Sequence, residues 1–522
     1  MTGVWRLVRL HVRSHWLVLV APALLLAGLV IATASGVKGL YPTAEDRAVY
    51  AVTMGASPAS WAFNGRSIDL DRIGGIAAYE VGLAGQLAIP AVGLLLGIGL
   101  TRRLEESGVI ELVTSGRVAR TAVPLAALVV GIGSWLLFAK ACEAGLYAMG
   151  FDRLGSQTYP SILALYGMAF TGIGLLAGQL SQGTRGAYGI GGLLAGAGFV
   201  TRAYVDGRQL RYVWASPMGW VAEAHPWGTW VWWPALSFIA LIVVTSGAAV
   251  LVASRRDLGS GVLQQRPGRA TATRVLTTAS GLAWRLTRGS MIGWAVGALT
   301  WCVSLGAMTD EMGRIIAENP TLAEALGGDP TQIETVMSLV LAAAMASAAA
   351  VAGMSRLGVE EGDARLGLVL AGAVSRTRVW LAWTGVVAAF AVVTLMMCGL
   401  GSGVAQWLTG SSRDAVMRNV EAAIAYVPGV LLVTFVAALL VALSPRMRGL
   451  GWLPVGWVLV VGLLGEALRL PRWTRDLSPF ELVGRVPVEA LDRTAWVWLA
   501  VAAMVACAAA TVRFGSRSLT RG

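Results

Sequence analysis

The chain has 522 residues, of which 56% are hydrophobic and only 13% are charged. A soluble domain carries about 25% charged residues, so this composition excludes an ordinary soluble protein and indicates an integral membrane protein. The net charge of +12 comes from basic residues scattered between apolar runs, which favours contact with a membrane surface and argues against nucleic acid.

Apolar runs long enough to cross a bilayer recur along the whole chain. A bilayer core of about 30 Å needs roughly 20 apolar residues in a helix. Twelve segments qualify: 16–36, 79–100, 122–147, 160–180, 186–204, 229–253, 291–309, 334–354, 379–400, 424–443, 450–468 and 494–512. The predicted fold is therefore an all-α polytopic membrane protein with about 12 transmembrane helices.

The first fifteen residues form a candidate amphipathic helix. Arg6, Arg9 and Arg13 lie on one stripe, and Trp5 with other apolar residues covers the remainder. Such a helix lies in the membrane interface with its arginines at lipid phosphates. Anchoring of the first span by positive charge alone is the alternative. A cleaved secretory signal also begins with basic residues, but the repeat described next predicts that this span is retained.

Four short matches relate the two halves of the chain in the same order and with similar spacing. They are Trp5-Arg6-Leu7 with Trp284-Arg285-Leu286, Tyr41-Pro42-Thr43 with Asn319-Pro320-Thr321, Glu105-Glu106 with Glu360-Glu361, and Ser216-Pro217 with Ser478-Pro479. We expect two parallel six-helix halves with pseudo-two-fold symmetry, residues 1–253 and 284–522, joined by a cytoplasmic linker at 254–283. Basic residues are denser in the segments that this topology places inside, so both termini are predicted to be cytoplasmic.

Two charged segments, 101–121 and 355–378, follow the second span of each half. Both begin with paired carboxylates and are longer than a simple turn requires. This pattern favours short surface helices that dock on a cytoplasmic partner, and a structural turn is the alternative. Paired carboxylates also serve acid–base catalysis, but no nucleophile or metal ligand accompanies them, and the cysteines and histidines are too dispersed for a metal site.

A few polar residues within the spans are weaker candidates for a substrate path. Lys140 and Glu143 can pair on one helical face near the outer end of the third span, although snorkelling to the interface explains them equally well. Gln86 and Gln179 are further candidates for a polar lining. The sequence has no G-x-x-x-x-G-K-[ST] loop, so any ATPase that drives this protein must be a separate chain.

Twelve spans in two parallel halves, each with an interfacial helix and a charged loop after its second span, resemble the type-2 ABC exporter permeases. The loops, with Glu-Glu followed by Gly and a Val-x-Arg-Thr ending, are similar to those of the exporter of polyketide antibiotics, or tetronasin-resistance-type, family. In that family the charged loop is the coupling helix that sits on the nucleotide-binding subunit. The resemblance assigns this role to Glu105, Glu106, Gly108, Glu111, Gly116, Arg120, Glu360, Glu361, Gly362, Arg365, Gly372 and Arg376.

The resemblance also implies partners and a mechanism. Two copies of a cytoplasmic ATPase would bind ATP and Mg²⁺, close on each other and move the coupling helices. The two halves would then alternate between inward-open and outward-open states and export a hydrophobic or amphiphilic small molecule from a bacterial cell membrane. The outer segments 205–228 and 469–493 would form short helices.

Two other functions fit the same sequence. A proton-coupled secondary multidrug carrier also has twelve spans in two parallel halves, but the spans here contain almost no acidic residue near their middle. A non-transporting membrane sensor that signals through an ATPase is the third hypothesis.

Overall fold

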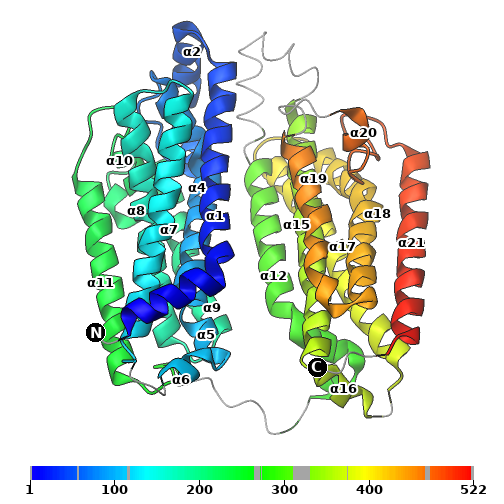
Figure 1. Ribbon diagram of the computed structural model, residues 1–522. Helices are drawn as coiled ribbons and strands as arrows, with labels where there is room; N and C mark the ends of the chain where they lie inside the picture. Colours follow the sequence, from blue (N-terminus) through cyan, green and yellow to red (C-terminus); the bar gives the residue numbers. More distant parts are fainter. Residues whose placement is uncertain are drawn as a thin grey trace. The chain divides into compact units, whose positions relative to one another are not determined.

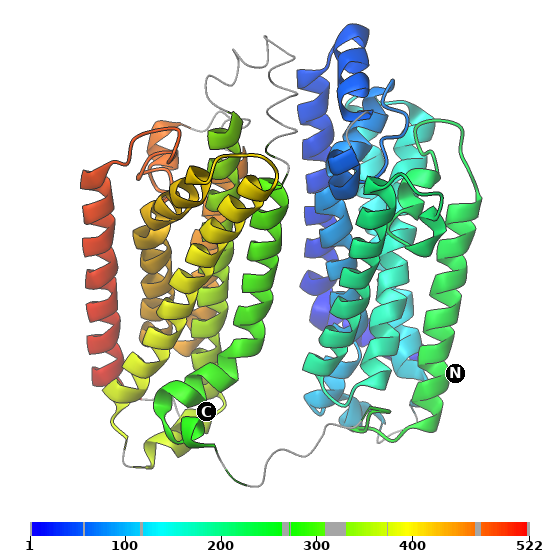
Figure 2. The same cartoon turned by 180° about the vertical axis from the view of Figure 1, so that it is seen from behind.

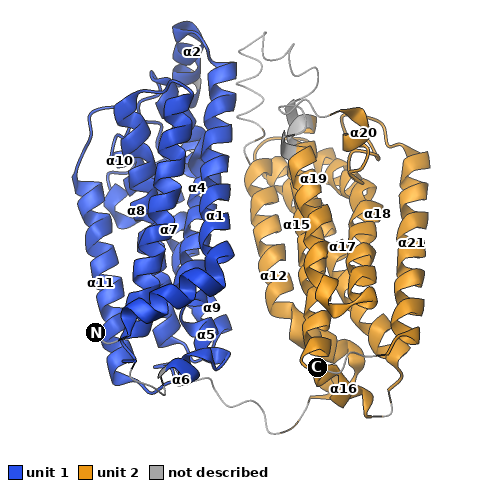
Figure 3. Cartoon of the chain, viewed as in Figure 1, with its two compact units in different colours: residues 1–267 blue, residues 268–522 orange. Residues whose placement is uncertain are grey.

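The structure is a computed structural model that describes residues 3–55, 58–114, 118–263, 271, 273–307, 309, 330–372, 374–464 and 471–518. Within these residues the chain forms helices joined by turns and loops, with one isolated bridge between Ser181 and Leu263. It divides into two compact units, unit 1 (residues 1–267) and unit 2 (residues 268–522), which Figure 3 colours separately.

Unit 1 is a bundle of long helices with short helices at both ends (Figure 1). Its elements are α1 (Val4–Leu40), α2 (Ala44–Gly55), α3 (Pro58–Asn64), α4 (Ile73–Gly99), α5 (Arg102–Glu106), α6 (Val109–Thr114), α7 (Ala122–Ala148), α8 (Arg153–Leu180), α9 (Thr184–Gly207), η1 (Val213–Ala215), α10 (Trp220–Glu223) and α11 (Trp233–Arg255). The predicted short helices of the outer segment 205–228 are η1 and α10.

Unit 2 has a comparable set of elements. They are η2 (Arg274–Thr277), α12 (Ala279–Gly306), α15 (Pro330–Gly362), α16 (Arg365–Leu370), α17 (Arg376–Leu408), α18 (Asp414–Leu443), η3 (Pro445–Gly451), α19 (Trp452–Leu464), α20 (Arg472–Arg475) and α21 (Arg493–Ser516). The short helix α20 lies in the predicted outer segment 469–493, whose first two residues are outside the described part.

The same pairs of helices pack together in the two units. In unit 1, α1 packs on α4 and α7, and α8 packs on α4, α7 and α11. In unit 2, α12 packs on α15 and α17, and α18 packs on α15, α17 and α21. The view from behind in Figure 2 shows these neighbours from the other side of each bundle. In each unit the fourth long helix, α8 or α18, therefore packs on three other long helices.

Ten helices of the described residues are long and apolar enough to cross a membrane, and they coincide with ten of the twelve predicted spans. The segment 186–204 forms α9, but this helix carries charged residues at both ends and does not meet the same criterion. The segment 450–468 corresponds to α19, whose described part spans only Trp452–Leu464. Each of these two segments is the fifth predicted span of its half of the chain.

Glycines allow α4 and α8 to approach closely. A Cβ at Gly93 would lie 2.6 Å from the carbonyl oxygen of Gly167, and one at Gly97 would lie 2.4 Å from that of Thr171. Because these contacts are to backbone atoms, a larger side chain cannot be accommodated by rotation. The indole of Trp135 packs against Gly167 and donates its Nε1–H to Thr171 Oγ1 at 3.0 Å. Small residues at such interfaces are the usual means of packing helices in lipid.

The beginning of α1 lies obliquely across unit 1 before the helix turns along the bundle (Figure 1). The change of direction falls at His15, whose φ of −127° is not helical. Arg6, Arg9 and Arg13 are exposed, while Leu7 is buried. This is the arrangement that the amphipathic pattern predicts. In unit 2, the matching Trp284 and Arg285 lie within α12, which runs as one helix from Ala279 to Gly306.

Residues 256–263 of the predicted linker are packed against unit 1. The amide of Leu263 donates to the carbonyl oxygen of Leu180 at 2.8 Å, and Arg102 Nη2 donates to that of Ser260 at 2.8 Å. The start of the predicted linker is therefore a structured part of unit 1, and α12 begins within its end.

Candidate functional site

The first charged segment folds into two short helices joined by a left-handed turn. Helix α5 ends at Glu106, Gly108 adopts φ +77°, and α6 begins at Val109. A positive φ suits glycine because it has no Cβ. On α6, Ile110 is buried, but Leu112 is 78% exposed.

The second charged segment has the same construction. Helix α15 ends at Gly362, Ala364 adopts φ +59°, and α16 begins at Arg365. On α16, Leu366 is buried, but Leu368 is 78% exposed. Alanine has a Cβ, so the left-handed backbone conformation is sterically unfavourable at this position.

The corresponding residues of the two segments are separated by a constant number of positions. The pairs are Glu105 with Glu361, Gly108 with Ala364, Ile110 with Leu366, Leu112 with Leu368, and Arg120 with Arg376. The structure therefore matches Glu105 to Glu361, one position away from the match of Glu105-Glu106 with Glu360-Glu361 that the sequence suggested.

The arginine that follows the last helix of unit 1 holds the Glu105 side chain inside that unit. Arg256, the C-cap of α11, contacts both carboxylate oxygens, with Nη1–Oε1 at 2.8 Å and Nη2–Oε2 at 2.6 Å. The amide of Gly259 donates to Oε1 at 2.7 Å, and Arg102 Nη1 lies 3.3 Å from Oε2. The Glu105 side chain is 4% exposed. We call this arrangement the Glu105–Arg256 clamp.

Unit 2 contains the equivalent contact. Arg517, the C-cap of α21, places Nη1 2.5 Å from Oε1 and Nη2 2.6 Å from Oε2 of Glu361, whose side chain is 1% exposed. Arg517 Nη2 also donates to the carbonyl oxygen of Val441 at 3.3 Å. We call this the Glu361–Arg517 clamp. Bidentate arginine–carboxylate pairs of this kind are among the strongest polar contacts in proteins.

One further arginine joins each clamp to the start of the third long helix. Arg120 Nη1 donates to the carbonyl oxygen of Arg256, and Arg376 Nη1 donates to that of Arg517, both at 3.1 Å. Each clamp therefore gathers three parts of its unit: the charged segment, the start of the third long helix and the end of the last helix.

The structure places the remaining predicted coupling residues as follows. Glu106 is exposed and accepts a hydrogen bond from the amide of Thr184 at 3.1 Å, at the start of α9. Glu360 lies between Arg356 Nη2 at 2.5 Å and Arg365 Nε at 2.8 Å.

The other predicted coupling residues differ in exposure. Three of them are exposed, namely Glu111, Gly362 and Gly372, and Gly116 lies outside the described residues. Glu105, Glu360 and Glu361 are buried, and the coupling role assigned to these residues stays a prediction.

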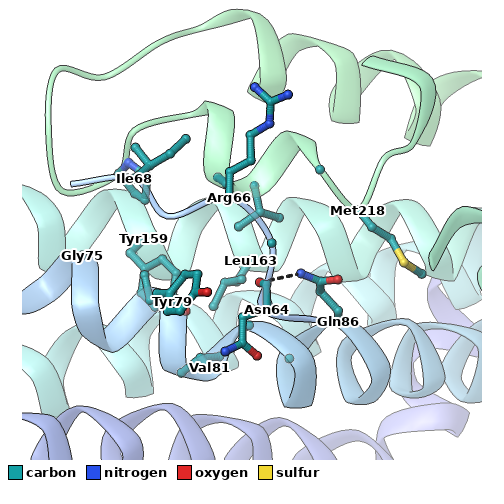
Figure 4. Close-up of a pocket in the computed structure, with 18 of the residues that line it drawn as sticks. Asn64, Arg66, Ile68, Gly75, Tyr79, Val81, Gln86, Tyr159, Leu163 and Met218 are labelled. Carbon is teal, nitrogen blue, oxygen red and sulfur yellow. Dashed lines mark hydrogen bonds between the residues drawn. The ribbon is translucent and has the colours of Figure 1, made fainter. Parts of the chain in front are cut away.

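The predicted path residues do not form one group. Lys140 Nζ lies 2.6 Å from Glu143 Oε2, and the lysine side chain is largely exposed. Gln179 belongs to the opposite end of unit 1, where its Oε1 accepts from Arg256 Nε at 2.7 Å. Gln86 alone lines an internal cavity (Figure 4), where its Nε2 donates to the carbonyl oxygen of Asn64 at 3.0 Å.

This cavity lies at the end of unit 1 remote from α5. Its walls include Tyr79, Tyr159, Tyr166, Arg202 and Trp227, and its volume is about 70 Å³. A drug-sized ligand needs about 300–1,000 Å³, so the cavity does not hold one in this conformation. In its wall, Arg202 and Arg66 both pair with the buried Asp206, at 3.7 and 3.2 Å.

Unit 2 contains a different polar cluster, made of Thr335, Gln406 and Asn419. Gln406 Nε2 donates to Thr335 Oγ1 at 3.1 Å, and Asn419 Nδ2 donates to Gln406 Oε1 at 2.8 Å. All three side chains are buried. The cluster ties α15, α17 and α18 together.

The structure adds four residues to the candidate site that the sequence did not indicate: Arg256, Arg517, Leu112 and Leu368. Each clamp arginine follows a span directly, where positive charge is expected for topology alone, and lies far along the chain from its glutamate. The leucines carry no sequence signal because the sequence does not show which face of a short helix is buried.

Known proteins resemble the chain over its whole length. The multidrug efflux system permease protein Rv1217c of Mycobacterium tuberculosis (strain ATCC 25618 / H37Rv) is 31% identical, and the similarity covers 100% of this chain and 95% of that protein. The family model for the C-terminal domain of the multidrug efflux system permease Rv1217c matches residues 276–515. The chain therefore belongs to the Rv1217c-like family of multidrug efflux system permeases.

Proposed function

We propose that this protein is the permease subunit of an ATP-driven exporter of hydrophobic or amphiphilic compounds such as antibiotics, powered by a separate cytoplasmic ATPase. The ATPase would bind ATP and Mg²⁺ and would occupy the inner face of a bacterial cell membrane as two copies. The two units would be six-helix repeats with both chain termini cytoplasmic. The exporter of polyketide antibiotics family remains the more specific proposal.

The observation that carries this proposal is the repeated surface around Leu112 and Leu368. Each leucine is 78% exposed on a short helix, at the same distance along the chain from a clamped glutamate. Burial of an exposed leucine contributes about 1.5–3 kcal/mol, so each can anchor a protein partner. A surface that occurs twice fits two copies of one partner, or two related subunits, better than a single ligand.

The polar groups around each leucine suit a protein contact. Arg103, Glu106 and Glu111 are exposed on α5 and α6, and Asp363 and Arg365 are exposed next to α16. An apolar anchor surrounded by groups of both charge signs is the usual composition of a protein interface. The buried clamps would fix the orientation of these short helices without taking part in the contact.

The proposal is tested by purifying the tagged protein from its host in mild detergent and identifying its partners by mass spectrometry. We expect a P-loop ATPase at two copies per chain. Leu112→Ser and Leu368→Ser should each reduce the recovered ATPase, and the double variant should lose it. Leu477→Ser is the matched control, because Leu477 is 65% exposed in the outer segment after α20.

The other outcomes identify the competing functions. Recovery of the chain alone, with transport that stops when the proton gradient is dissipated, would establish a secondary carrier instead. An associated ATPase that responds to drugs without any movement of a compound would establish a sensor.

A further inference from the structure

The two clamps connect the charged segments to the last helix of each unit. Helices α11 and α21 lie at the edge of their units, with only 28% and 22% of their most apolar stretch buried. Each packs mainly along one neighbour, α8 or α18. The C-terminal end of each helix is fixed by its clamp arginine to the charged segment. A displacement of that segment therefore reaches the last helix directly.

We propose that Arg256 and Arg517 are positioning residues that make α11 and α21 move together with the ATPase-docking segments. This inference rests on the proposed function, because it assigns the movement to a docked ATPase. The clamps meet the requirement for a rigid connection: both glutamates are buried, both Nη atoms of each arginine are used, and the pairing geometry is bidentate.

The two clamps differ in the further polar groups that contact the glutamate, so the two units should respond differently when the clamp arginine is lost. Glu105 also receives the amide of Gly259 and the charge of Arg102. Among the described residues, the polar contacts of the Glu361 carboxylate come from Arg517 alone. Loss of Arg517 therefore leaves its glutamate with less compensation than loss of Arg256 does, and the connection in unit 2 should be the more sensitive of the two.

The test uses the purified complex of this chain with its ATPase, with and without ATP and vanadate, and measures hydrogen exchange by mass spectrometry. In the wild type, nucleotide should change exchange in the charged segments and in the last turns of α11 and α21. Arg256→Gln should keep the response in residues 102–114 and lose it in α11, while α21 still responds. Arg517→Gln should give the converse result, with the larger loss.

Two further variants separate positioning from a general structural defect. The exchanged pair Glu361→Arg with Arg517→Glu should restore the α21 response that each single variant loses, because the Glu361 carboxylate has its contacts with Arg517, whereas Arg517→Lys should retain the response only in part. A response of α11 that persists in Arg256→Gln would overturn the inference and leave the docking proposal intact. A wild-type preparation that contains no ATPase would overturn both.

Discussion

Ala364→Gly is expected to stabilise the second charged segment, and Gly108→Ala to destabilise the first. Ala364 has φ +59° and ψ 6°, a left-handed conformation that costs an L-residue about 1–2 kcal/mol. The greater freedom of glycine in the open chain offsets about 0.4–1 kcal/mol of that gain. The net stabilisation is therefore about 0.5–1 kcal/mol, and glycine is also the better residue at the N-cap of α16.

Gly108→Ala should change stability by a similar amount in the opposite direction. A Cβ at Gly108 would have no atom within 4 Å, so the backbone penalty acts without an added clash. A change of 0.5–1 kcal/mol corresponds to about a two- to fivefold change in a local opening equilibrium. The two substitutions thus test one physical cause at two equivalent positions.

Hydrogen exchange of the detergent-purified protein measures this local opening. Exchange in α16 should slow by that factor in Ala364→Gly, and exchange in α6 should accelerate in Gly108→Ala. Ala371→Gly is the control, because Ala371 at the end of α16 has an ordinary φ of −70°, and glycine there should accelerate exchange. If Ala364→Gly accelerates exchange as Ala371→Gly does, strain at Ala364 is not the controlling factor.

Two predictions concern the packing of α8, one against α4 and one against α7. Gly97→Ala should lower the thermal unfolding temperature by the equivalent of about 1–3 kcal/mol, because its Cβ would meet the Thr171 carbonyl oxygen at 2.4 Å. The control Gly196→Ala, where a Cβ would have open space around it, should leave the unfolding temperature unchanged or raise it. Equal changes in unfolding temperature for the two variants would refute the packing argument. Thr171→Val keeps the shape but removes the acceptor of Trp135 Nε1, which should cost about 1 kcal/mol in the same assay; no measurable loss would show that the hydrogen bond does not contribute.

The parts of the fold that depend on hydropathy could be predicted from the sequence. Ten spans are confirmed because a run of about 20 apolar residues has few alternatives to a transmembrane helix. The segment 334–354 is rich in alanine, and the helix that contains it is the most buried of the candidate spans found in the described part of unit 2. A helix surrounded by others is selected for small side chains, so the alanines there reflect close packing.

The function of the carboxylates could not be predicted in the same way. The sequence shows that Glu105 and Glu361 are charged and near the membrane surface, which suggests exposure. It does not show that Arg256 and Arg517 return to the same place after four further long helices. A charge pattern alone does not distinguish a docking contact from a buried pair, because that distinction depends on the tertiary fold.

The two units are most alike where the charged segments lie and least alike at their other ends. The clamped glutamate, the left-handed turn, the exposed leucine and the arginine at the third long helix all recur at a constant separation. At the opposite end, unit 1 has the pairing of Asp206 with Arg66 and Arg202, whereas unit 2 has the amide and hydroxyl cluster around Gln406. Two copies of one ATPase require two equal surfaces. A single asymmetric small molecule makes no such demand on the ends of the units that face away from the ATPase, so the difference between these ends is compatible with the proposed exporter.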